Sequence, residues 1–164
     1  MLIKNARHAA AVLALVIFAI PAAQAQGTAT QNVEYSVASI QKIALTGAPA
    51  LDILTAVAGS APTSVTNATA SYAITTNTTG CKITASLGAN MGTGLTLSAN
   101  LVAPPAATSA GKLSLTTGAV DMVTGITKLN ASGLGVTYSL DATSAAGVVT
   151  SATAVVTYTV TAGT

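Results

Sequence analysis

The sequence has few charged and few aromatic side chains, although half of it is apolar. Of its 164 residues, 6% are charged and 3% aromatic, against 51% hydrophobic, and it contains one cysteine and no tryptophan. A disordered chain combines low hydrophobicity with high charge, a coiled coil is rich in Glu, Lys and Leu, and a disulfide scaffold has many cysteines. The composition therefore excludes these three classes.

Residues 1–25 have the order of a secretory signal peptide. The basic residues Lys4 and Arg7 precede an apolar run over 9–20, and Ala23-Gln24-Ala25 forms a small-x-small cleavage site. A membrane anchor is the alternative, but the run is shorter than the ~20 residues that a spanning helix needs. We expect cleavage before Gln26, which would leave residues 26–164 as a single secreted or cell-surface domain without a transmembrane segment.

Loss of this peptide would remove much of the chemistry of the chain, including its only His and its only Phe. The remaining charges balance each other: Lys42, Lys82, Lys112 and Lys128 stand against Glu34, Asp52, Asp121 and Asp141. The basic excess therefore belongs to the peptide, and the domain lacks the positive surface that binding to nucleic acid requires.

The residue types that form catalytic and metal sites are too few to build one. A transition-metal site needs clustered His, Cys or carboxylates, and a serine nucleophile needs a positioned base. Two alternatives stay open at this point: a calcium site shared by Asp121 and Asp141, and a serine–lysine dyad. The sequence predicts no enzyme activity, no cofactor and no metal.

Alternation of apolar and polar residues with period two runs through the domain and predicts β-strands. We expect strands at 33–37, 42–46, 71–76, 81–87, 95–102, 112–117, 135–141 and 151–161. Segments 51–58 and 119–124 have weak helical character, of a turn or so. Seven to nine short strands without alternating helices predict an all-β fold, an antiparallel, immunoglobulin-like β-sandwich, with a closed barrel as the alternative.

Every tyrosine lies in an apolar-x-Tyr-x-apolar pattern, so we expect all four on the buried face, against the alternative of a ligand-stacking platform. Cys81 has no partner for an intrachain disulfide, and its parity with Ile83 predicts burial, with an intermolecular disulfide as the alternative. At the C-terminus Thr153, Thr157, Thr159 and Thr161 share one face, which predicts an exposed, uncharged threonine surface.

The two ends of the expected domain have almost none of the charged residues and prolines that normally protect sheet edges. Val33, Tyr35 and Val37 near the N-terminus form an alternating strand pattern suited to pairing with another chain. We predict that these three residues belong to a strand between subunits.

A low-charge sandwich rich in Thr, Ala, Gly and Val, with an alternating strand at each end, resembles bacterial fimbrial and surface-filament subunits with immunoglobulin-like folds. The lone Cys81 departs from the disulfide typical of chaperone–usher pilins. The resemblance implies a non-enzymatic structural subunit of a pilus, filament or surface layer, with copies of itself as partners. The alternative is a monomeric cell-surface adhesin or carbohydrate-binding module, with a surface glycan as its partner.

Overall fold

The computed structural model describes residues 27–163. The predicted signal peptide, residues 1–25, lies outside them. The chain divides into two units, the first ending at Ser36 and the second beginning at Val37. In the first unit, residues 27–36 form no helix or strand and are exposed.

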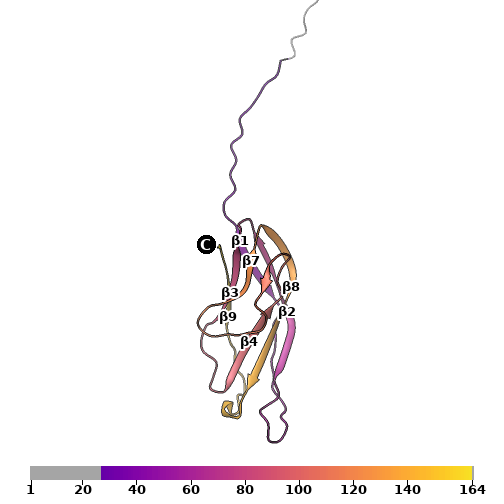
Figure 1. Cartoon of the computed structure of the whole chain (residues 1–164), viewed down its shortest axis with the longest axis vertical. Helices are drawn as coiled ribbons and strands as arrows, with labels where there is room; N and C mark the ends of the chain where they lie inside the picture. The colour runs from indigo at the N-terminus through magenta and orange to yellow at the C-terminus, as the bar shows by residue number, and fades with distance from the viewer. Residues whose placement is uncertain (1–26, 164) are drawn as a thin grey trace, which may run out of the picture. The chain divides into compact units, whose positions relative to one another are not determined.

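The second unit is built from antiparallel strands and one short 3₁₀ turn, Ser144–Ala146. The strands are β1 (Gln41–Thr46), β2 (Val65–Thr76), β3 (Cys81–Leu87), β4 (Leu95–Leu101), β5 (Thr108–Ser109), β6 (Leu113–Ser114), β7 (Val120–Ile126), β8 (Leu129–Ala142) and β9 (Val156–Thr161). This confirms the prediction of an all-β fold (Figure 1).

The strands form two sheets with the core between them. One sheet has the order β1-β2-β8-β4-β6 and the other β5-β7-β3-β9. Period-two alternation determines the inward faces: Cys81, Ile83, Ala85 and Leu87 of β3 are at most 4% exposed, while the residues between them are half-buried. Tyr72, Ile74, Val136 and Leu101 meet them from the other sheet. The molecule is therefore a β-sandwich of antiparallel strands.

Several local predictions differ from the structure. Residues 120–124 belong to strand β7 and not to a helix, and 51–58 is a loop with an isolated bridge between Ala56 and Pro62. Residues 33–37 form no strand within the described chain, and their pairing with a second subunit stays a prediction. The C-terminal strand begins at Val156, five residues later than predicted.

The loops and turns gather at opposite ends of the sandwich, and two names are useful for them. The turn end comprises residues 38–40, 77–80 and 127–128, where β1 begins and β2 joins β3. The loop end comprises residues 51–64, 88–94 and 143–155, which precede β2, β4 and β9. In Figure 1 the loop end is the lower end of the sandwich.

Candidate functional site

The predicted intersubunit residues are exposed. Val33, Tyr35 and Val37 are 73%, 92% and 77% exposed. Such exposure is notable because valine and tyrosine side chains are usually at least partly buried. Tyr35 therefore contradicts the expectation that all the tyrosines are buried. Because these side chains alternate with Glu34 and Ser36, an extended backbone would place all three on one face.

The first and last strands of the sandwich are both edge strands. In the described part of the chain, β1 pairs with β2 alone and β9 pairs with β3 alone. The two strands belong to different sheets, yet some of their Cα atoms lie within 8 Å of each other. The two edges therefore lie beside each other, and each has a backbone side that pairs with no other strand between residues 27 and 163; we call this pair of free edges the open edge.

The core is incompletely covered along the open edge. Val156, Tyr158 and Val160 of β9 point inward but are only half-buried, unlike the inward residues of the neighbouring strand β3. On β1, Ile43 is half-buried and Leu45, which has the same parity, is 42% exposed. An apolar side chain that faces a core normally loses nearly all its contact with water, so no element of residues 27–163 fully covers this edge.

A hydrogen bond between two tyrosine hydroxyl groups joins β9 to the opposite sheet. The Tyr158 hydroxyl donates to the Tyr138 hydroxyl at 2.9 Å, and the bond joins the two sheets across the core. Burial raises the pKa of both tyrosines. Burial also raises the pKa of Tyr72 to about 12, and its hydroxyl donates to the Val102 carbonyl at 2.6 Å. These three tyrosines pack in or against the core, as predicted, and have structural partners.

Asn77 fixes the start of β1 at the turn end. Its Oδ1 accepts a hydrogen bond from the Ile40 amide at 2.7 Å, and its Nδ2 donates to the Ala38 carbonyl at 2.8 Å. The Asn77 amide also donates to the Ile40 carbonyl at 3.3 Å. The sequence analysis did not identify this role of Asn77. Its position in a turn just after a strand was the available signal.

The predicted threonine surface is divided by the start of β9. Thr157 and Thr159 are exposed on β9, and Thr161 at its end is half-buried, with a hydroxyl oxygen that has no hydrogen-bond partner. Thr153 is exposed but lies before the strand. Thr157 and Thr159 stand opposite Ser86 and Thr84 of β3, so the outward face of this sheet is rich in small hydroxyl side chains.

Cys81 is buried and free, as its parity predicted. Its Sγ lies 2.7 Å from the Thr78 hydroxyl and 3.3 Å from the Thr76 hydroxyl. A buried thiol with these neighbours serves as a packed core residue, and an intermolecular disulfide would require the core to open.

Asp121 and Asp141 lie apart, on strands of different sheets, each beside a lysine. Lys82 Nζ lies 3.0 Å from an Asp121 carboxylate oxygen, and Lys112 Nζ lies 3.3 Å from Asp141 Oδ2. A hydrogen bond from Ser64, together with Lys112, lowers the pKa of Asp141. Between residues 27 and 163 no three His, Cys, Asp or Glu side chains form a group that could hold a metal ion.

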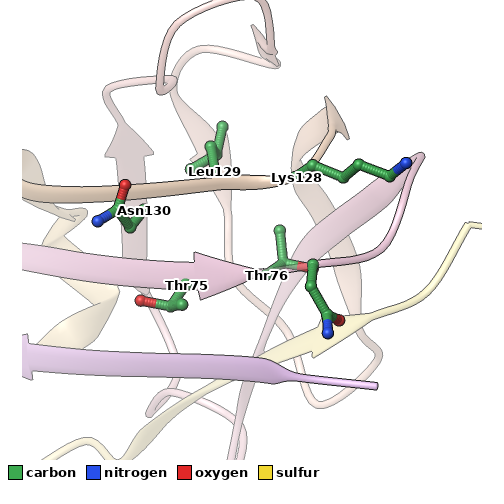
Figure 2. A pocket seen from close by; sticks show the side chains of 6 residues that line it. Thr75, Thr76, Lys128, Leu129 and Asn130 are labelled. Atoms are coloured by element: carbon green, nitrogen blue, oxygen red, sulfur yellow. The ribbon is translucent and has the colours of Figure 1, made fainter. Parts of the chain in front are cut away.

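A shallow depression where β2 ends and β8 begins is the other surface feature of note (Figure 2). Thr75 and Thr76 of β2 line it beside Leu129 and Asn130 of β8, and the Lys128 side chain extends away from Asn130. Its lining contains no aromatic ring, so it lacks the stacking surface on which sugar-binding sites commonly depend.

Comparisons of the chain with protein-family models, curated proteins and solved structures find no match. The described residues also include no helix with the length and hydropathy needed to cross a bilayer.

Proposed function

We propose that this protein is a non-enzymatic structural subunit of an extracellular pilus, filament or surface layer, and that its copies assemble by β-strand pairing. The N-terminal segment, residues 27–37, of one copy would occupy the open edge of the next. The observation that carries the proposal is a complementary pair within one chain: an exposed alternating apolar segment, and an edge whose inward apolar residues are half-covered.

The dimensions of the two partners agree. Strand β9 has 6 residues, and a strand of that length spans roughly 20 Å. The N-terminal segment can reach roughly 35 Å when extended, at about 3.3 Å per residue. It is therefore long enough to pair with the whole free edge of β9.

The side chains also correspond. Val33, Tyr35 and Val37 repeat the pattern of Val156, Tyr158 and Val160, so the segment would place residues of the same size and parity beside β9. Full burial of a large apolar side chain contributes roughly 1.5–3 kcal/mol. Backbone hydrogen bonds to β9 would add to this contribution, as in other cases of strand addition.

On this proposal the sandwich is immunoglobulin-like and lacks one strand, which a second copy supplies. Secretion and a position at the cell surface follow from the N-terminal sequence pattern and from the low charge of the domain. The alternative of a carbohydrate-binding module or monomeric adhesin would need an exposed aromatic surface. Among the described residues the exposed tyrosine is Tyr35, which lies on the N-terminal segment.

Electron microscopy of the chain from residue 26 onward tests the proposal. We expect filaments or oligomers, and we expect a variant with Val33→Ser, Tyr35→Ser and Val37→Ser to remain monomeric, because the segment would lose its apolar face. The matched control, Glu34→Ser with Ser36→Ala, changes the opposite face and should assemble. Assembly by the triple variant as efficient as by the control would show that the segment is not the connecting element.

A further inference from the structure

Exposed large apolar side chains gather at the loop end of the sandwich. Leu54 and Val57 are 86% and 70% exposed in one loop, and Val148 and Val149 are 94% and 51% exposed in another. The first loop ends and the second begins near the same pair of residues, because Val65 at the start of β2 pairs with Leu140 near the end of β8. Asp52 is the single charged residue of this end. An exposed apolar group with so little charge is typical of a protein contact surface.

Hydrogen bonds hold these loops in position. Around Val57 the chain forms a small hairpin, closed by the bond from the Thr63 amide to the Thr55 carbonyl at 2.8 Å. In the other loop, the Thr143 amide donates to the Gly94 carbonyl at 2.8 Å. Gly94 has a φ of +73°, and a Cβ there would lie 2.5 Å from the Ala146 backbone nitrogen, so glycine is required for this close approach. The apolar side chains therefore project from an ordered support.

The N-terminal segment joins the sandwich at the opposite end. Asn77 holds Ala38 and Ile40 at the turn end, and the adjacent turn is fixed by the bond from the Lys128 amide to the Thr78 carbonyl at 2.9 Å. Lys128 is exposed and forms no ion pair in the part of the chain that the structure describes. Ile40, at the same end, is 38% exposed.

We propose that the loop end is a second contact surface between copies, and that it docks on the turn end of the copy that donates the N-terminal segment. This inference rests on the proposed function. A copy whose open edge receives the segment must lie next to the donor's turn end, because the segment leaves the donor there. The free edge of β9 begins at the loop end, with Val156 directly after the exposed Val155. The loop end is thus continuous with the edge that receives the segment.

Charge favours the same arrangement. Asp52 of one copy would face Lys128 of the other, whereas contact between two turn ends would bring like charges together. The two surfaces differ from each other, so the contact is heterologous and propagates as an open chain instead of closing as a dimer. The strand would then supply the connection, and the loop end would fix the angle between neighbouring copies.

Lysine substitutions in the full domain test this contact. We expect Leu54→Lys and Val148→Lys to raise the concentration needed for assembly about tenfold each, since each removes the burial of one large apolar side chain. Val102→Lys is the matched control, because Val102 is 54% exposed and lies at neither end. We expect Asp52→Lys and Lys128→Asp to weaken assembly singly, and the double variant to recover it. Sedimentation velocity gives the assembled fraction, and thermal denaturation shows that each variant is folded.

The possible outcomes separate the two proposals. If both lysine variants assemble as well as the wild type, the loop-end contact is wrong. Loss of assembly in the triple variant at Val33, Tyr35 and Val37 would still support strand exchange in that case. The loop-end contact would also be wrong if the protein binds lipid vesicles or apolar beads and Leu54→Lys abolishes that binding without changing assembly. The loop end would then bind an apolar surface and not a second copy.

Discussion

The tyrosines illustrate how one residue pattern has different outcomes at different positions. Tyr72, Tyr138 and Tyr158 have an apolar ring in or against the core and a hydroxyl with a partner, as buried tyrosines normally do. Tyr35 has the same apolar neighbours along the chain but is exposed. Tyr35 differs because no strand of the described chain lies paired beside it. The residue and its immediate neighbours in the sequence do not determine this difference.

The buried hydroxyl of Tyr72 makes the stability of the fold sensitive to alkaline pH. Its pKa is about 12 in the folded protein and about 10 when unfolded, so the unfolded state loses its proton first as pH rises. Below pH 10 the effect is absent. Between about pH 10 and 12 the free energy of unfolding should fall by roughly 1.4 kcal/mol per pH unit on account of this residue.

Urea denaturation of wild type and Tyr72→Phe across this pH range measures the effect. The Phe variant should be about 1 kcal/mol less stable at neutral pH, because the Val102 carbonyl loses its hydrogen bond. Its stability should then decline less steeply above pH 10. The control Tyr35→Phe should follow wild type. Parallel pH profiles for wild type and Tyr72→Phe would mean that the hydroxyl is not buried as described.

At the scale of single elements, period-two alternation predicted some strands closely and missed another. Strand β3 has the predicted bounds, 81–87, because its alternation coincides with burial on one face, and the bounds of β4 differ by one residue from those predicted. Strand β7 was not predicted, because Met122 and Val123 are adjacent and both buried, where the register with β3 shifts. The shift interrupts the alternation on which the prediction depended.

The candidate site was predictable in part. The alternating residues Val33, Tyr35 and Val37 are visible in the sequence, and so is the shortage of charge around them. The open edge was not predictable, because it depends on β1 and β9 lying at the edges of different sheets, and nothing in the sequence determined strand order. Asn77 was missed for the same reason, since its partners Ala38 and Ile40 lie in a distant part of the sequence.

The hydrogen bonds of the Asn77 side chain with Ala38 and Ile40, which we call the Asn77 clamp, give a prediction about the start of β1. Asn77→Ala removes the two side-chain hydrogen bonds to Ala38 and Ile40, each worth about 1 kcal/mol. We expect the fold to persist and the Ile40 amide to exchange with solvent about tenfold faster, as its acceptor is lost. Hydrogen exchange followed by NMR measures this rate. Asn130→Ala, on the exposed face of β8, is the control, and equal Ile40 exchange rates in the two variants would contradict the clamp.

For the whole molecule, the low charge and the exposed apolar side chains are both consistent with assembly of many copies. The domain expected after processing has no net charge, so copies of it repel each other little. Its exposed apolar side chains lie mainly on the N-terminal segment, along β1 and at the loop end. A monomeric protein would leave these surfaces in water, whereas a chain of copies would cover them.

The most direct test of strand exchange supplies the segment as a separate molecule. A peptide of residues 27–39 is titrated into a variant lacking residues 27–36, and binding is followed by calorimetry and by the thermal midpoint. The variant retains Val37 and the whole sandwich unit, so it should fold alone. We predict binding in the micromolar range or tighter and a midpoint raised by several degrees, because the peptide covers the open edge.

The same titration has its own controls. A peptide with Val33→Ser, Tyr35→Ser and Val37→Ser should not bind, and Val160→Asp in the recipient should weaken the binding of the wild-type peptide by placing a charge in the open edge. Equal binding of both peptides, or no binding and no change in the midpoint with either, would contradict assembly through the N-terminal segment.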